Sequence, residues 1–341
     1  HFWLQRGVDG FRCDMACEVP LTFWEETIKD IKAQYPNVFM LAEGEEPLLQ
    51  SQCGFHSSYS WELHHMMNDI AKGNKSIDDL VSYIKKDTER HPEGAYRLMF
   101  ITNHDENSWA GTEFERMGDA VQAMAVLTFT LPGGQPLIYT GQEMGWDHRF
   151  QFFEKDPIPT WEENAHTDFY RDLIAFKHSN PALSAGIGHG EFEIISTDNN
   201  TLTFTRSVPG NKVKVSVQLE APWRWEYRTV CDPVDRVEPL SWWTGMKMPL
   251  QLLVQGEGIS EYNVTIEGGA GVSVENVNKA DSPNYLFVDV KVAADAQPGT
   301  YYIVFSKDGE SFKYPYEIAA RREGSAERTS FTTADMIYLI M

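Results

Sequence analysis

The 341-residue chain predicts an α/β region followed by an all-β region. Up to about residue 185, short apolar runs alternate with helical patterns, which is typical of parallel strands joined by crossover helices. After Pro181 the apolar residues recur with a period of two between turn residues, which is typical of antiparallel strands. The alternation in the first region does not by itself distinguish an open sheet from a closed barrel.

The first region contains four strand candidates, which are residues 7–14, 38–43, 97–102 and 135–140. Helices are expected at about 20–35, 61–71, from Ile77 onward, 115–128, and up to Asn180. In the first helix Leu21, Trp24 and Ile28 recur at steps of three and four, and Pro36 ends the pattern. Ser76 followed by Asp79 resembles a capping box. The stretch between residues 43 and 61 is expected to be a loop.

The second region predicts three strands in GEFEIIST, TLTFTRSV and KVKVSVQL, and then a run, 222–232, without a clear pattern. Five further strand candidates with turns between them predict a small β-sandwich at 233–320. The expected domains are therefore 1–185, 186–221, the seam 222–232, 233–320, and a linker with an apolar strand at 321–341.

Composition limits the classes of partner and site. The net charge of −21, from 29 basic and 50 acidic side chains, argues against nucleic acid and is compatible with a neutral substrate. Cys13, Cys17, Cys53 and Cys231 form no zinc or disulfide pattern. The spacing of Cys13 and Cys17 could hold a metal, but no second ligand pair accompanies it, so buried free thiols and no metal site are expected. No apolar run is long enough for a membrane span, and the opening residues, which read as the interior of a domain, show no signal peptide.

Acidic residues follow three of the predicted strands. Arg12 and Asp14, two positions apart, share one face of the first strand. They could form a buried salt bridge, or Asp14 could be a positioned carboxylate whose ionisation Arg12 secures. Glu43 ends the second strand, and His104 and Asp105 follow the third. Because the carboxyl ends of parallel strands converge, these acids are expected at one mouth, where barrel enzymes place their chemistry.

Glycoside cleavage explains a need for several carboxylates. One attacks the anomeric carbon, a second protonates the leaving oxygen and later activates water, and a third can stabilise the transition state. Asp14 beside Arg12 suits the ionised nucleophile. Glu43 needs a less polar or an anionic setting to hold a proton. The strand spacing would bring the two carboxyl groups to the roughly 5 Å typical of retaining enzymes.

The motifs GVDGFRCD, LAEGEE, FITNHDEN and GGQPLIYTGQEMG resemble, in order, four motifs of the alpha-amylase family of glycoside hydrolases. The resemblance implies a (β/α)8 barrel of which residues 1–185 hold the strands resembling the fourth to the eighth. It implies Asp14 as nucleophile, Glu43 as acid/base and Asp105 as transition-state stabiliser. Arg12 would orient Asp14, and His104 would bind a glucose hydroxyl.

Several positions depart from the family pattern. An earlier motif and the first barrel strands are absent, so an incomplete barrel with weak or no activity on α-glucans is expected. Cys17 and Glu18 stand where the family often has Lys or His. Calcium is implied by the family, but its usual ligands are not evident. Glu45 and Glu46 are alternatives to Glu43 as the acid, but they lie past the strand.

The segment PLSWWTGMKMPLQLLVQG resembles the Ig-like N-terminal domain of neopullulanase- and cyclomaltodextrinase-like members, and TTADMIYLIM resembles the start of their barrel. The chain thus reads as the back of one amylase joined to the front of another. A gene fusion, a fragment and a circular permutation all fit this order, although the missing strands argue against permutation of a complete enzyme. A homodimer through the Ig-like region is compatible with this organisation.

A non-catalytic glucan-binding or subunit-association module is the alternative function. In that case Trp242 and Trp243 would contact sugar or another subunit, although core packing is favoured for both. The His64–His65 pair is expected on a helix surface.

Overall fold

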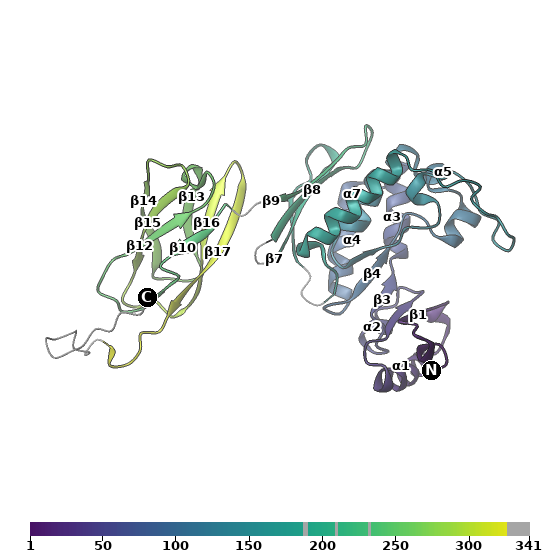
Figure 1. Ribbon diagram of the computed structural model, residues 1–341, viewed down its shortest axis with the longest axis horizontal. Helices are drawn as coiled ribbons and strands as arrows, with labels where there is room; N and C mark the ends of the chain where they lie inside the picture. Colours follow the sequence, from purple (N-terminus) through teal and green to yellow (C-terminus); the bar gives the residue numbers. More distant parts are fainter. Residues whose placement is uncertain (187–189, 209–210, 231–232, 326–341) are drawn as a thin grey trace, which may run out of the picture. The chain divides into compact units, whose positions relative to one another are not determined.

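The computed structural model describes residues 1–186, 190–208, 211–230 and 233–325. The chain divides into two compact units, His1–Cys231 and Asp232–Met341 (Figure 1). The apolar strand expected near the C-terminus, and Cys231, lie outside the described residues. None of the helices in the described part of the chain combines the length and apolar character needed to span a bilayer.

A five-stranded parallel sheet organises the first unit. Its order is β1 (Gly10–Cys13), β2 (Phe39–Ala42), β3 (Ser57–Tyr59), β4 (Tyr96–Met99) and β5 (Gly134–Pro136). β1 and β2 approach so closely that a side chain on Gly10 would collide with the Phe39 carbonyl. The prediction of a plain loop between residues 43 and 61 is wrong, because β3 lies there. Its short, serine-rich sequence carries no apolar pattern, and pairing with both neighbours makes it a strand.

The helices of this unit are α1 (Leu21–Gln34), α2 (Pro47–Ser51), α3 (Trp61–Ala71), α4 (Ile77–Arg90), α5 (Glu113–Met117), α6 (Val121–Thr130) and α7 (Ala165–Ser179). The Ser76 capping box is confirmed, because the Ser76 N–H donates to Asp79 Oδ2 at 2.8 Å. The single helix expected at 115–128 is instead split into α5 and α6. Gly118, with φ of 55°, ends α5 and turns the chain between them.

A second sheet completes the first unit. It is antiparallel, in the order β6 (Glu191–Ser196), β7 (Thr201–Val208), β8 (Asn211–Gln218) and β9 (Trp225–Val230). β9 lies in the stretch expected to be a seam. Its alternate residues Trp225 and Tyr227 contact Phe169 and Phe176 of α7, which explains why this segment forms a strand.

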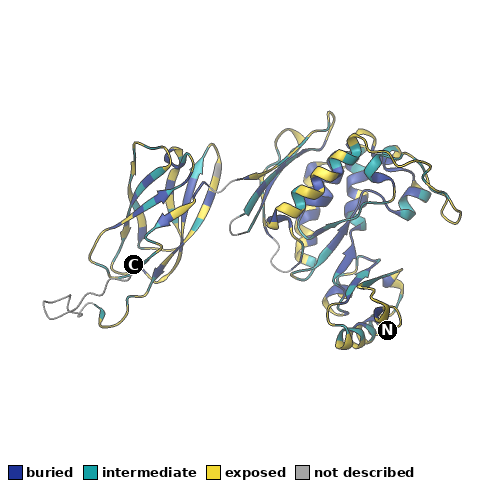
Figure 2. Ribbon diagram, viewed as in Figure 1, coloured by how far each residue is buried: buried dark blue, intermediate teal, exposed yellow. Residues whose placement is uncertain are grey.

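The core of the first unit joins the two sheets through helices. Buried residues of α3, α4, α6, β7 and β8 form one apolar cluster, and α1 covers β1 and β2 in another. Figure 2 shows the resulting exposed outer face of α7, whose Tyr170 and Leu173 are buried beneath it.

The second unit is a β-sandwich, as predicted (Figure 1). One sheet has the order β10 (Arg236–Glu238), β12 (Leu250–Gln255), β15 (Tyr285–Val292) and β14 (Val272–Lys279). The other has the order β11 (Ser241–Trp243), β17 (Glu310–Ala319), β16 (Gly299–Lys307) and β13 (Asn263–Glu267). The expectation that Trp242 and Trp243 are core residues is wrong: neither is buried, and Trp243 is 41% exposed.

Candidate active site

Strands β1 and β2 deliver Asp14 and Glu43 to adjacent positions. Cys13 and Ala42 are partners in the ladder, and the pairing continues because the Glu43 N–H donates to the Cys13 carbonyl at 2.9 Å. The Ala16 N–H in turn donates to the Glu43 carbonyl at 2.9 Å. Since paired strands lie about 4.8 Å apart, the two acidic residues leave the sheet side by side.

A single guanidinium group joins the two carboxylates. Arg12 Nη1 lies 2.5 Å from Asp14 Oδ1, and Arg12 Nη2 lies 2.8 Å from Glu43 Oε1. Its Nε donates to the hydroxyl of Tyr59 at 3.2 Å, so the group contacts three side chains of the site. The expectation that Arg12 and Asp14 share one face is confirmed, with Phe11 packed against the core on the other.

Asp14 is an exposed carboxylate held in place by a cation. Its side chain is 73% exposed, so a buried Arg–Asp salt bridge is the wrong interpretation. The hydrogen bond from Arg12 lowers the pKa of Asp14, and a contact with Glu43 and the charge of His104 act in the same direction. Asp14 is therefore both accessible and ionised at neutral pH, which a carboxylate nucleophile requires.

Glu43 is more enclosed, with a side chain that is 13% exposed. Its Oε2 accepts a hydrogen bond of 2.7 Å from the Met15 N–H. Met15 has the left-handed conformation (φ 44°, ψ 43°), which is strained for a side chain of this kind and aims the N–H at the carboxylate. The anionic part of the setting expected for Glu43 is present, because the Asp14 carboxylate contacts it. The Arg12 guanidinium group and the Met15 N–H contact it as well, so the setting is polar.

His104 and Asp105 follow β4 at the same end of the sheet. His104 Nε2 lies 3.4 Å from Asp105 Oδ2, and both side chains are partly exposed. Burial raises the pKa of Tyr59, and the charges of Glu43 and Asp105 raise it further, so this hydroxyl lies among the acids. The structure thus brings the sequence-predicted residues to one mouth of the sheet.

Tyr59 is a site residue that the sequence did not reveal. It belongs to β3, the strand without an apolar pattern, and it reaches the site only because β3 pairs between β2 and β4. Helical spacing could have indicated that a second residue, His64, is buried. His64 lies three positions before Met67 on α3, so the two side chains share one face of the helix, and Met67 is buried. The surface prediction for His64 is wrong: the side chain is fully buried, with Nε2 2.9 Å from Glu106 Oε2.

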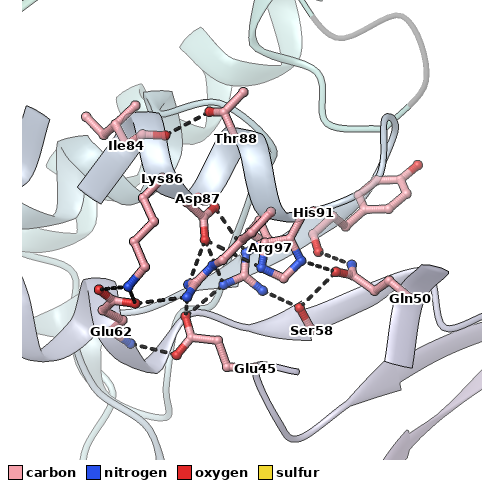
Figure 3. Close-up of polar contacts among 12 residues, drawn as sticks. Glu45, Gln50, Ser58, Glu62, Ile84, Lys86, Asp87, Thr88, His91 and Arg97 are labelled. Carbon is pink, nitrogen blue, oxygen red and sulfur yellow. Dashed lines mark hydrogen bonds and ion pairs between the residues drawn. The ribbon is translucent and has the colours of Figure 1, made fainter. Parts of the chain in front are cut away.

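Glu45 belongs to a largely buried charge network (Figure 3). Its Oε1 lies 2.8 Å from Arg97 Nη2 and 3.1 Å from Arg90 Nη2, and its Oε2 accepts from the Glu62 N–H at 2.9 Å. Burial raises the pKa of Glu45, and Arg97 opposes that shift. Because Glu45 is fully engaged, the geometry favours Glu43 over Glu45 as the reactive acid.

A cavity of about 530 Å³ opens beside Glu43. It is lined by the segment that follows β1, by residues 43–47, and by Trp61 and Arg90. The cavity therefore lies against the side chain of Glu43.

The family resemblance implies calcium, whose protein ligands are carboxylate and carbonyl oxygens. Among the described residues, no group of three or more His, Cys, Asp or Glu side chains is arranged to hold a metal ion.

Two family models match the chain. The alpha-amylase catalytic domain matches residues 1–186, and the N-terminal domain of cyclomaltodextrinase matches residues 236–322. Alpha-amylase MalA of Haloarcula japonica is 33% identical over 182 residues, covering 52% of this chain and 26% of that protein. Neopullulanase 2 of Thermoactinomyces vulgaris is 26% identical over 208 residues, covering 54% and 33%. The chain thus spans between about a quarter and two fifths of the curated relatives it matches.

Solved structures share the fold. Maltogenic alpha-amylase AmyB of Thermotoga neapolitana gives a TM-score of 0.56 at 17% identity, covering 93% of this chain and 63% of that one. An alpha-amylase from Lactobacillus plantarum gives 0.55 at 19% identity, covering 85% and 63%. Because the catalytic-domain match extends over more than half of the chain, this protein belongs to the alpha-amylase family of glycoside hydrolases.

Proposed function

We propose that Asp14, Glu43 and Asp105 form a retaining glycosidase site for α-glucans. The observation that carries this proposal is the position of Arg12, which holds the Asp14 and Glu43 carboxylates side by side on one guanidinium group. Two carboxyl groups at short range are the arrangement of retaining enzymes, whereas inverting enzymes leave room for a water molecule. The names of the relatives, an alpha-amylase and a neopullulanase, support an α-glucan as substrate.

In the proposed reaction Asp14 attacks the anomeric carbon while Glu43 donates its proton to the departing glycosidic oxygen. The glycosyl group is then an ester of Asp14. Glu43, now ionised, removes a proton from water, and the resulting oxygen attacks the anomeric carbon and releases Asp14. Asp105 stabilises the positive charge of both transition states, and His104 donates a hydrogen bond to a sugar hydroxyl.

We expect this polypeptide on its own to turn over slowly. The parallel sheet of the described residues runs from β1 to β5, whereas closing a barrel of this type takes eight strands. Catalytic side chains need supports that hold them to within about 0.5 Å, and the outer strands of the sheet provide fewer of these. The catalytic-domain match supports an enzyme over a non-catalytic glucan-binding or association module. The homodimer through the second unit stays a prediction.

Covalent trapping tests the assignment even when turnover is slow. α-Maltosyl fluoride needs no proton to release its fluoride, so Glu43→Gln should still form the glycosyl ester at Asp14 but hydrolyse it poorly. We expect mass spectrometry to find maltosyl on the peptide that contains Asp14. Glu46→Gln, which alters a neighbouring exposed carboxylate, should not accumulate the ester. An adduct on another residue, or none at all, would refute the proposed roles.

A further inference from the structure

The segment that carries His104 and Asp105 is attached to a polar cluster beneath the mouth, here named the clasp (His64, Asn68, Glu106 and Arg116). Two members lie on α3, one follows Asp105 in the chain, and one lies on α5. The side chain of Asp105 is 32% exposed and that of His104 is 43% exposed, whereas that of His64 is fully buried. The two residues at the mouth are therefore next to a neighbour that is anchored in the interior.

Glu106 is the point of attachment. Its Oε2 lies 2.9 Å from His64 Nε2, and its N–H donates to Asn103 Oδ1 at 2.8 Å. Its carbonyl accepts from the Gly111 N–H at 3.0 Å, which closes the π-helical turn at Glu106–Ala110. Turns of this kind are rare and occur frequently at functional sites. Glu106 is thus fixed through both its side chain and its backbone.

The His64 ring is itself held in one orientation. It stacks on Phe100 with a centroid distance of 4.8 Å and an interplanar angle of 21°. Its Nδ1 lies 3.3 Å from the Phe100 carbonyl oxygen, and its Nε2 lies 3.2 Å from Asn68 Nδ2. Both ring nitrogens contact polar groups, so the edge of the ring that faces Glu106 has a defined position.

Arg116 joins the two ends of the segment. It is buried, and it donates from Nη2 to the Ile101 carbonyl and from Nε to the Gly111 carbonyl, both at 2.9 Å. Its Nη1 donates to Asn68 Oδ1 at 3.0 Å, which connects it to α3. Because residue 101 precedes the two mouth residues and residue 111 follows them, one guanidinium group spans the whole segment.

A buried polar cluster of this kind is a weak source of stability. The cost of removing charged groups from water offsets most of their attraction, so apolar side chains of similar size would hold α3 and α5 together about as well. Hydrogen bonds add direction, because they form only within narrow limits of distance and angle. In the clasp these directed contacts converge on the residue next to Asp105, where the position of a side chain matters most.

We propose that Glu106 is a positioning residue, which through the clasp fixes Asp105 and His104 at the mouth without contacting the sugar. This inference rests on the proposed function, because that assignment gives Asp105 its part in both transition states. A shift of about 1 Å in a group that acts on a transition state can slow a reaction by about 10²-fold. Loss of the clasp should therefore slow the reaction more than it weakens binding of the ligand.

Substitutions in the full chain carrying Glu43→Gln, in which the ester accumulates, test the clasp. Glu106→Ala removes the contact with His64, so the limiting rate of ester formation from α-maltosyl fluoride should fall at least about tenfold. The concentration that gives half of this rate should change less than about fivefold, the scale of one neutral hydrogen bond. Glu106→Gln keeps a hydrogen bond to the ring and should react within about threefold of the parent chain.

Leu63→Ala is the matched control, because Leu63 is also buried on α3 but lies outside the clasp. It should lower the stability of the first unit and leave the rate of ester formation unchanged. A rate that falls with stability alone would fall in this variant too.

Amide hydrogen exchange gives a readout that needs no reaction. The Asn107 N–H donates to the Asn103 carbonyl at 2.9 Å, and the Gly111 N–H donates to the Glu106 carbonyl. In Glu106→Ala the peptide that holds residues 103–111 should exchange at least about tenfold faster, while peptides from β1 and β2 keep their rates. Glu106→Gln should keep most of the protection.

The clasp is refuted by any of three results. One is ester formation at the parent rate in Glu106→Ala, and another is an equal loss of rate in Leu63→Ala. The third is unchanged exchange of residues 103–111 in Glu106→Ala. A parent chain that forms no ester at Asp14 refutes the proposed catalytic roles, and faster exchange of residues 103–111 in Glu106→Ala would then still support the anchoring by Glu106.

Discussion

Replacing Arg97 with methionine removes the central cation of the charge network in Figure 3. Arg97 lies on β4 and is buried. Its Nη2 lies 2.8 Å from Glu45 and 3.2 Å from Asp87, its Nε donates to Asp87 at 3.2 Å, and its Nη1 donates to Ser58. The substitution keeps an unbranched side chain of similar reach, but it removes the positive charge that pairs with Glu45 and Asp87.

We expect the free energy of unfolding of the first unit to fall by about 3 kcal/mol. Breaking a buried ion pair from one side costs roughly 3–5 kcal/mol, because a charge is left buried without its partner. The lower figure applies since Arg90 remains 3.1 Å from Glu45 and 3.0 Å from Asp87. For a unit of this size, about 3 kcal/mol corresponds to a fall of about 6–12 °C in Tm.

Differential scanning calorimetry of the full chain measures this change, with the transition of the second unit as an internal reference. Lys86→Met is the matched control, because Lys86 is exposed and its contact with Glu62 is worth less than about 1 kcal/mol. The double change Arg97→Met with Asp87→Leu should cost less than Arg97→Met alone, since it also removes the unpaired charge.

The pH dependence gives a second signature. Burial alone would raise the pKa of Asp87, but Arg97 and other neighbours hold it below its ordinary value. Their contribution to stability is therefore present above about pH 3.9 and is lost as pH falls through the lowered pKa. Without Arg97 the pKa of Asp87 rises, so the folded variant binds a proton at a higher pH than the native chain does. The difference in stability between the two chains therefore narrows as the pH falls from neutral toward acid. A Tm shift below about 2 °C, or a difference that is constant over this range, refutes the reasoning.

Three further predictions concern the site, a buried histidine and the core. In Arg12→Lys the ammonium group of lysine cannot hold two carboxylates as the planar guanidinium group does. Formation of the Asp14 ester from α-maltosyl fluoride should therefore slow by up to about 10²-fold, and an unchanged rate contradicts the positioning role of Arg12. Burial, and after it the nearby cations, lower the pKa of His91 to about 4. The free energy of unfolding therefore falls as the pH drops from 6.5 toward 4, because the unfolded chain binds a proton there that the folded chain does not. Over this range the Tm of His91→Gln should fall less than the Tm of the native chain. Leu63→Ala, at a buried position of α3, should cost about 2–5 kcal/mol in urea unfolding, against less than about 0.5 kcal/mol for the exposed Leu48→Ala; equal costs refute the core assignment.

The strands and helices with a strong period were predictable from the sequence. The pattern of Leu21, Trp24 and Ile28 gave α1, and the two-residue spacing of Arg12 and Asp14 placed both on one face of β1. Short strands whose apolar residues do not recur at a regular spacing were not predictable. β3 is a strand because it pairs with β2 and β4, so its Tyr59 could not be assigned to the site from the sequence.

The sequence by itself determined which residue types stand at the strand ends, because the periods of strands and helices are local properties of the chain. It therefore indicated Asp14, Glu43 and Asp105 as the candidate acids. Only the tertiary structure decided their partners. The Met15 N–H contacts Glu43 and the Phe152 ring meets His104 because segments distant in sequence pack together, and local periodicity does not encode which distant segment a side chain will meet.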